Sequence, residues 1–493
     1  SRAQVTLILN YYFNPTANAK AAHSMAALMC RSLLLAALFT TKAGAQSKPA
    51  RVPLLRQQAS SPYVVKLDRE SRQGLTSNGA DLTVYTAILQ LGEPKPGRKP
   101  QELRVVFDLS SGQVVVPSKE CRDVTCFKHA RYNKWASQTA QDVNADGEPV
   151  HPTKALVSAA EAEEVGGRDS LEIGVDVVDL GPGEVKGELI KEKLCLSTEH
   201  DEIKCSTLAI VAAKSMSDLP FRVLPNDGIV GLGMDGVSLS PKFSFLKHFM
   251  ADALGGRNVA QQFGLFLGGS TGGEIAFGGY DARRLQSPIA WVPVTNPEQG
   301  FWQMEILAVR LGNQTLDVCG NAEGGCRGIV DTGASQVSVP ATMASPLEEV
   351  IRTALIGASG QDVSTDLQLV LDGATVTIPA ASYAGGPGCL SNPAACRPML
   401  ARHHIADPIG RGVFVLGDSV LRPYYTVFDL QEKRIGFGAA SGATAAMKAG
   451  LLTGPAHQAL SRNESSRRLK ASNTNVLLLI QVTTRRSVTK VML

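Results

Sequence analysis

The sequence predicts a mostly β protein made of two duplicated β-rich lobes with a cleft between them. The chain has 493 residues, of which 44% are hydrophobic, so it can form two domains with buried cores. Its 47 glycines and 26 prolines separate short runs of Val, Ile and Leu, which is typical of strands joined by turns. An apolar run followed by an aspartate and small residues occurs in each half of the chain. This repetition predicts the duplication.

The strands and loops can be placed in chain order from their patterns. In the first half, residues 84–91 alternate as a strand, 92–99 form a loop, and 103–107 form the strand that leads to Asp108. Residues 135–170 are polar and are expected to be a surface loop. In the second half we expect strands within 291–311, an aspartate loop at 328–339, a short helix at 347–356, and closing strands within 413–438.

Composition divides the chain into segments of different expected roles. We expect a leader sequence outside the fold at 1–24, a signal peptide at 25–45, a pro-segment at 46–80, an N-terminal β lobe at 81–285, a C-terminal β lobe at 286–440, and a disordered basic tail at 441–493.

The signal peptide is predicted from Arg31, an apolar run, and small residues at 43–45. A buried N-terminal helix is the alternative. This signal places the protein in the secretory pathway, either secreted or in an acidic lysosome- or vacuole-like compartment. The formal net charge of +4 arises from basic ends around an acidic body, which argues against a nucleic-acid partner. No segment is apolar for long enough to span a membrane.

Eight cysteines beyond Cys30 fall into close pairs, which in an exported chain predict disulfides that close small loops. The expected disulfides are Cys121–Cys126, Cys195–Cys205, Cys319–Cys326 and Cys389–Cys396. Zinc is the competing interpretation, but the spacings are not Cys-x-x-Cys and no histidines are interleaved. Asn313 and Asn463 are expected glycosylation sites. No metal or cofactor is expected.

The two aspartate loops are expected to carry the chemistry. Asp331 begins the motif Asp-Thr-Gly with Thr332 and Gly333, and Asp108 occupies the equivalent place in the first half. Two carboxyl groups held close together do not both ionise, because like charges push their pKa values apart. The charged one can take a proton from water while the protonated one donates to a carbonyl oxygen. This predicts hydrolysis of an amide without a covalent intermediate.

These loops and several ordered motifs resemble the pepsin-like aspartic proteases (peptidase A1) over residues 84–439. Among the motifs are Phe107–Ser118, Cys121–Cys126, Gly181–Gly187, Asp227–Gly233, Gly273–Asp281 and Tyr424–Asp429. The resemblance implies a bilobal fold, a polypeptide substrate bound in the cleft between the lobes, a zymogen that is processed, and a monomer. It also implies that Asp108 and Asp331 form the catalytic dyad. Ser111 would then donate a hydrogen bond to Asp108, and Leu180, Gly181 and Gly183 would belong to the flap.

The first loop departs from the family pattern. Leu109 stands in place of the family's Thr, and Ser110 stands in place of a glycine. Leu180 stands where the flap has a Tyr, and Val115 stands where a Trp bonds that Tyr. Two functions therefore remain open: an aspartic endopeptidase active at acidic pH, or a catalytically impaired, secreted relative that acts as a binding or inhibitor protein.

Overall fold

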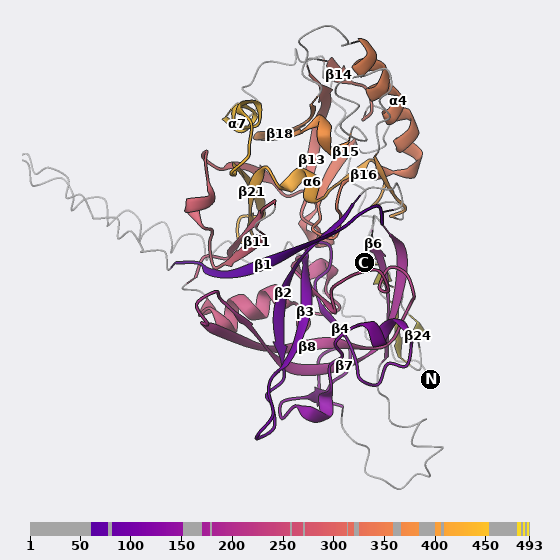
Figure 1. The fold of residues 1–493 in the computed structure, drawn as a ribbon, viewed down its shortest axis with the longest axis vertical. Helices are drawn as coiled ribbons and strands as arrows, with labels where there is room; N and C mark the ends of the chain where they lie inside the picture. The colour runs from indigo at the N-terminus through magenta and orange to yellow at the C-terminus, as the bar shows by residue number, and fades with distance from the viewer. Residues whose placement is uncertain are drawn as a thin grey trace, which may run out of the picture. The chain divides into compact units, whose positions relative to one another are not determined.

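The structure is a computed structural model, and its described residues form two β-sheets (Figure 1). It describes residues 61–76, 81–150, 170–177, 180–256, 259–269, 272–312, 314–319, 325–357, 366–383, 400–405, 409–452, 481–484, 487–488 and 491–492. The mostly β fold class predicted from the sequence is confirmed. The predicted leader, signal peptide and residues 46–60 lie outside the described residues.

The first sheet contains strands from both the start and the end of the chain. Its strands are β1 (Tyr63–Arg72), β2 (Leu82–Leu91), β3 (Gln101–Asp108), β4 (Val114–Pro117), β5 (Gln141–Asp142), β6 (Ser170–Val177), β7 (Gly181–Ser197), β8 (Ile203–Met216), β9 (Gly228–Gly231), β10 (Gln262–Leu267), β11 (Gly273–Phe277), β12 (Ala290–Pro293), β21 (Tyr424–Asp429), β22 (Arg434–Ala439), β23 (Gln481–Thr484), β24 (Ser487–Val488) and β25 (Val491–Met492).

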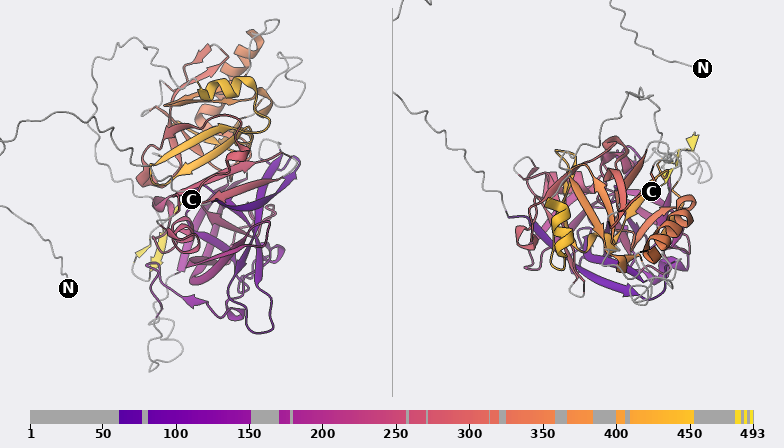
Figure 2. Two further views of the ribbon diagram at one scale, coloured as in Figure 1. Left: turned by 90° about the vertical axis from the view of Figure 1, so that its left-hand side faces the viewer. Right: turned by 90° about the horizontal axis from the view of Figure 1, so that it is seen from above.

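The second sheet lies wholly within the later half, in the order β18-β17-β13-β15-β20-β16-β19 with β14 beside β13. Its strands are β13 (Gln303–Leu311), β14 (Gln314–Leu316), β15 (Cys326–Val330), β16 (Val337–Pro340), β17 (Leu367–Leu371), β18 (Ala374–Ile378), β19 (Ala401–His403) and β20 (Val413–Leu416). The α-helices are α3 (Phe245–His248), α4 (Ala341–Gly357), α6 (Asp418–Leu421) and α7 (Ala445–Leu452). Figure 2 shows the orange strands of the second sheet gathered at one end of the described body and most of the indigo to magenta strands at the other, where the yellow strands β23 and β25 pair with β6.

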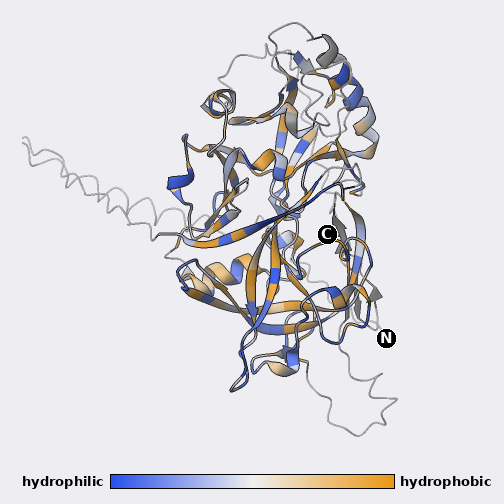
Figure 3. Ribbon diagram, in the orientation of Figure 1, coloured by the Kyte–Doolittle hydropathy of each residue, from blue (hydrophilic) through white to orange (hydrophobic). Residues whose placement is uncertain are grey.

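β1 corrects the predicted start of the folded body. The sequence prediction assigned residues 46–80 to a pro-segment, but the first half of β1 pairs with β11 and its second half pairs with β2. Tyr63, Val65 and Leu67 are buried while the residues between them are not, which is the alternation of a strand with one face on the core. The bands of orange and blue along the strands in Figure 3 follow this alternation. Residues from Tyr63 onward therefore belong to the fold.

The predicted boundary at residues 285/286 falls between strands of one sheet. The closing strands β21 and β22 return to pair with β10 and β12 respectively, so this sheet draws on both predicted lobes. Trp302, at the start of the second lobe, is fully buried and donates its indole N–H to the Leu232 carbonyl at 2.9 Å. Its ring packs edge-on against Phe428, which stacks on Phe263. The two lobes therefore share part of one aromatic core.

The predicted disordered tail is wrong at α7 and at the last strands. Met447 and Leu451 of α7 are 1% and 5% exposed, and both belong to the main apolar core. They are four residues apart, so one face of the helix carries both. β23 pairs antiparallel with β6, and β25 pairs parallel with the same strand.

Candidate active site

The first aspartate loop is built on a strand that another strand supports from behind. β3 ends at Asp108, the chain turns, and it leaves along β4. β9 runs parallel to β3 and places Gly231 opposite Asp108, and the Leu232 N–H donates to the Asp108 carbonyl at 2.6 Å. A side chain on Gly231 would lie 2.5 Å from the Ser111 carbonyl oxygen, so only glycine fits this close approach.

The second loop repeats this arrangement in the other sheet. β15 leads to Asp331 and β16 leads away from it, while β20 runs parallel to β15 and pairs Val330 with Leu416. The Asp331 N–H donates to the Leu416 carbonyl at 3.2 Å. The predicted duplication therefore extends to the strand that lies behind each loop.

The two carboxyl groups are held in the same way and adjoin the same space. The Ser110 N–H donates to Asp108 Oδ1 at 3.0 Å, and the Gly333 N–H donates to Asp331 Oδ1 at 2.8 Å. A Cβ placed on Gly333 would lie 3.2 Å from Asp331 Oδ1 and 3.7 Å from Asp108 Oδ1. The structure thus brings the two predicted aspartates together beside Gly333, which is itself exposed. Such a pair can share a proton and act on one water molecule.

The hydroxyl that contacts Asp108 is not the one that the resemblance implied. The Ser110 Oγ donates to Asp108 Oδ1 at 2.7 Å, in addition to the bond from its own N–H. The Ser111 Oγ is buried and has no hydrogen-bond partner among the described residues. The prediction that Ser111 holds Asp108 is therefore wrong in this structure, because the extra hydroxyl at position 110 lies closer to the carboxylate.

The cross-connection between the two loops is present on one side. The Thr332 Oγ1 donates to the Phe107 carbonyl at 2.5 Å, a bond between positions 225 residues apart. Leu109, the equivalent residue in the first loop, is fully buried in the main apolar core and has no hydroxyl to return the bond. The Phe107–Thr332 bond therefore lets a side chain of the second loop hold the first loop in place.

Ser335 and Asp418 support the second loop and were not predicted as site residues. The Ser335 Oγ accepts a hydrogen bond from the Thr83 N–H at 3.1 Å, so it ties this loop to β2. Asp418 lies behind the loop, where its N–H donates to the Ala334 carbonyl at 2.8 Å. Neither residue has a distinctive sequence signal, since a small polar residue after a motif has many possible roles.

Asp418 is a buried acid whose ion-pair partner is Arg422, and Arg69 adds a further positive charge nearby. It is 2% exposed, and Arg422 Nε lies 3.1 Å from its Oδ2, within ion-pair distance although not aligned as a hydrogen bond. Burial raises the pKa of the Asp418 carboxyl, because the low-dielectric surroundings disfavour its charge, and the Arg422 guanidinium opposes this effect.

The predicted flap is a hairpin in the structure. β6 and β7 pair antiparallel, with Val177 opposite Gly181 and Val175 opposite Gly183, and Leu180 lies in the turn that joins them. Gly183 approaches Pro220 so closely that a Cβ would lie 2.4 Å from the proline ring. Val115 belongs to a buried apolar cluster that also contains β6 and β7 side chains such as Leu171 and Val185. Val115, which stands in place of the family's Trp, is therefore part of an apolar cluster that it shares with the flap strands.

Three of the predicted disulfides are confirmed: Cys121–Cys126, Cys195–Cys205 and Cys319–Cys326. Cys195 and Cys205 face each other across β7 and β8. The fourth predicted disulfide, Cys389–Cys396, lies outside the described residues, as do both predicted glycosylation sites, Asn313 and Asn463. Within the described ranges, no group of three or more His, Cys, Asp or Glu side chains is arranged to hold a metal ion. No helix in those ranges has the length and apolar character needed to span a membrane.

Comparison with known proteins agrees with this geometry. Residues 85–149 and 176–440 match the family model described as eukaryotic aspartyl protease. Human gastricsin is 25% identical over 72% of the chain and 83% of its own length. Pepsin II-1 of Oryctolagus cuniculus is 24% identical over 72% of the chain and 81% of its length. Cathepsin E of the same species is 26% identical over 78% of the chain and 84% of its length.

Proposed function

The chain belongs to the eukaryotic aspartyl protease family, and from this membership we propose that it is an active endopeptidase whose catalytic dyad is Asp108 and Asp331. One carboxyl group is charged and takes a proton from a water molecule held between the two. The water oxygen attacks the peptide carbonyl carbon while the other carboxyl group protonates the carbonyl oxygen. The C–N bond then breaks as the nitrogen receives the proton that the first carboxyl group took from water, while the second carboxyl group takes back a proton from a hydroxyl of the tetrahedral intermediate.

The observation that carries this proposal is the position of both carboxyl groups beside Gly333. Each Oδ1 accepts an N–H from the residue two positions later, so both groups are oriented by equivalent turns. Both groups adjoin one exposed space, where a water molecule and a substrate carbonyl can reach the two of them together.

The departures in the first loop are compatible with activity in this geometry. Leu109 is fully buried in the main apolar core, and the Ser110 hydroxyl is bonded to Asp108. Thr332 still connects the two loops from the other side. The loss of the family's Thr and Gly therefore leaves both aspartates held.

We further propose that the protein functions as a monomer in an acidic compartment of the secretory pathway. The disulfides support an oxidising route, because such bonds persist outside the cytosol. A basic pro-segment is proposed within residues 46–62, ahead of β1. Its lysines and arginines would pair with acidic groups of the body at neutral pH and would be released when those groups are protonated.

The test is cleavage of an unfolded protein by the full chain between about pH 3 and pH 7, where carboxyl groups titrate. We expect cleavage at the acidic end, inhibition by a statine-type transition-state mimic, and a loss of roughly 10²–10⁴-fold in Asp108→Asn and in Asp331→Asn. Asp372→Asn is the matched control, since Asp372 is exposed in a turn and should retain full activity.

The alternative is a catalytically impaired binding or inhibitor protein, which the Leu109 and Leu180 departures would favour. It is supported if no cleavage occurs at any pH, with or without removal of the N-terminal segment. A partner bound equally well by the wild type and by the double aspartate variant would then identify that function.

A further inference from the structure

A second pocket lies away from the aspartate loops. It has a volume of about 520 Å³, and no residue of either loop lines it. Its floor is the outer face of β1 and β11, and its walls are residues 198–202 and the short helix Ala282–Arg284. A volume in the range of roughly 300–1,000 Å³ is typical of small-ligand sites.

The walls of this pocket are held in place by buried hydroxyl groups. The Tyr63 hydroxyl contacts the carbonyl oxygens of Leu196 at 2.6 Å and Glu202 at 2.8 Å, which ties the 198–202 turn to β1. The Tyr425 hydroxyl accepts a hydrogen bond from the Asp281 N–H at 2.9 Å. The pocket is therefore largely pre-formed, and a ligand would not need to order it.

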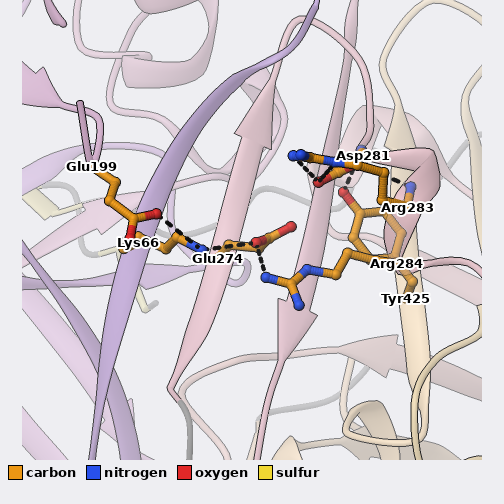
Figure 4. Close-up of polar contacts among 7 residues, drawn as sticks. All are labelled: Lys66, Glu199, Glu274, Asp281, Arg283, Arg284 and Tyr425. Atoms are coloured by element: carbon orange, nitrogen blue, oxygen red, sulfur yellow. Dashed lines mark hydrogen bonds and ion pairs between the residues drawn. The ribbon is translucent and has the colours of Figure 1, made fainter.

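Carboxylates outnumber cations in the lining. The acids are Glu199, Glu202, Glu274 and Asp281. His200 also lines the pocket, and the permanently charged cations are Lys66, Arg283 and Arg284. Each of these cations already contacts an acid of the pocket (Figure 4). Both oxygens of Asp281 accept hydrogen bonds from Arg283. An anionic ligand would have to break these pairs, so the lining disfavours it.

Glu274 has an acceptor that the described residues leave unused. The residue is 1% exposed, and its Oε2 contacts Arg284 at 2.5 Å and Lys66 at 3.5 Å. Its Oε1 is buried and has no hydrogen-bond partner within the described part of the chain. In Figure 4 this oxygen points away from both cations, toward the side where Asp281 and Arg283 lie. A buried carboxylate oxygen without a donor is unfavourable, so a bound donor would stabilise the site.

We propose that this pocket binds a primary ammonium group through Glu274. An ammonium group brings positive charge to a net negative lining and N–H donors to the free Oε1. A divalent metal ion fits less well, since Lys66 and Arg284 would repel it more strongly and it needs several oxygen ligands. The Lys66 ammonium already lies 3.5 Å from both Glu199 and Glu274, so the pocket accommodates this group.

Two sources can supply the ammonium group. One is a lysine side chain of a separate peptide. The other is the amino terminus that cleavage just ahead of β1 would create, because Pro62 and Tyr63 line the pocket. Only this second source rests on the proposed removal of an N-terminal segment.

The test is titration of the full chain with Nα-acetyl-lysine amide, with binding measured by calorimetry. Nα-acetyl-norleucine amide, which lacks the ammonium group, is the ligand control and should not bind. Glu274→Gln should weaken binding by roughly tenfold or more, because it removes a charge-assisted hydrogen bond. Glu432→Gln, an exposed position outside the pocket, should leave binding unchanged.

Lys66→Met provides a second variant that keeps Glu274 intact. It removes the competing ammonium group and should tighten lysine amide binding. Titration of both variants does not depend on catalysis, so it is informative even if the protein cleaves nothing. Absence of ammonium-dependent binding in both the wild type and Lys66→Met, or equal binding in Glu274→Gln, overturns the proposal.

The two sources are separated by cutting the folded chain at a protease recognition sequence placed at residues 56–60. If the new amino terminus is the ligand, it occupies the pocket, so the cut chain no longer binds lysine amide. The Glu274→Gln change then does not restore lysine amide binding to the cut chain. If an external lysine is the ligand, the cut and uncut chains bind it equally. Either result identifies the source of the ammonium group.

Discussion

Thr332 and Phe107 form a direct bond between the two halves of the candidate active site. The Thr332 hydroxyl donates to the Phe107 carbonyl at 2.5 Å, and Phe107 immediately precedes Asp108. In a symmetric pair of loops a second hydroxyl would make the reciprocal bond, but Leu109 occupies that position. The Thr332 hydroxyl therefore makes one of the bonds, together with that between Ser335 and Thr83, that hold the second loop against the first half of the chain.

Thr332→Val should destabilise the protein and reduce its activity. The variant keeps the side-chain shape and leaves the Phe107 carbonyl without its donor, which costs about 1–3 kcal/mol when the group is buried. The free energy of unfolding, measured by denaturant titration, checks this. Thr332→Ser retains the hydroxyl and should differ little from the wild type, and an equal loss in both variants would contradict the role of the bond.

Ser110→Ala should lower the turnover number more than Ser111→Ala does. The Ser110 hydroxyl bonds Asp108 Oδ1 at 2.7 Å, whereas the Ser111 hydroxyl has no partner among the described residues. A hydrogen bond to a charged group contributes about 1.5–3 kcal/mol, so a loss of roughly tenfold or more is expected. The KM should change less than kcat, since the hydroxyl orients the aspartate. A larger effect of Ser111→Ala would restore the role that the family resemblance implied.

Asp418 should contribute stability to the protein in acid that is lost at neutral pH. Burial raises the pKa of its carboxyl, so the folded state binds this proton more tightly than the unfolded state does. The resulting stability is fully present below the unfolded value of about 3.9 and is lost as the pH rises through the folded pKa. The free energy of unfolding should be measured at about pH 4 and at about pH 7. The value at about pH 4 minus the value at about pH 7 should be lower for Asp418→Asn than for the wild type.

Asp372→Asn serves as the control for this measurement, because Asp372 is an exposed turn residue. It should keep the pH dependence of the wild type. If all three proteins change equally between the two pH values, the buried carboxyl is not the source of the effect.

Much of the site was predictable because the aspartate loops have a short-range signal. An apolar strand, an aspartate and small residues are adjacent in the sequence, and local cysteine pairs gave three of the disulfides. Ser335 and Asp418 were missed because their partners are distant: Thr83 is 252 residues from Ser335. The Ser110 bond was missed because the choice between adjacent hydroxyls depends on side-chain geometry.

The errors at the ends of the folded body have a related cause. The segment 46–80 is polar and basic overall, and this average composition concealed the alternation of Tyr63, Val65 and Leu67. The Ala- and Gly-rich segment after residue 440 likewise concealed α7, in which Met447 and Leu451 are buried. In both cases burial against distant strands, which local composition does not encode, determines the structure.

Tyr63→Phe tests whether β1 is a permanent part of the fold. The Tyr63 ring is buried beside Phe249, and its hydroxyl contacts the carbonyls of Leu196 and Glu202. Burial raises the pKa of this hydroxyl to about 12, so it remains a donor throughout the neutral and acidic range. Removing it should lower the free energy of unfolding by about 1–3 kcal/mol, because the carbonyl oxygens of Leu196 and Glu202 lose the one O–H donor that they share. Tyr280→Phe is the matched control, since the Tyr280 hydroxyl has no hydrogen bond to the described residues. If β1 were instead a removable segment that the body does not need, both variants would unfold at the same denaturant concentration as the wild type.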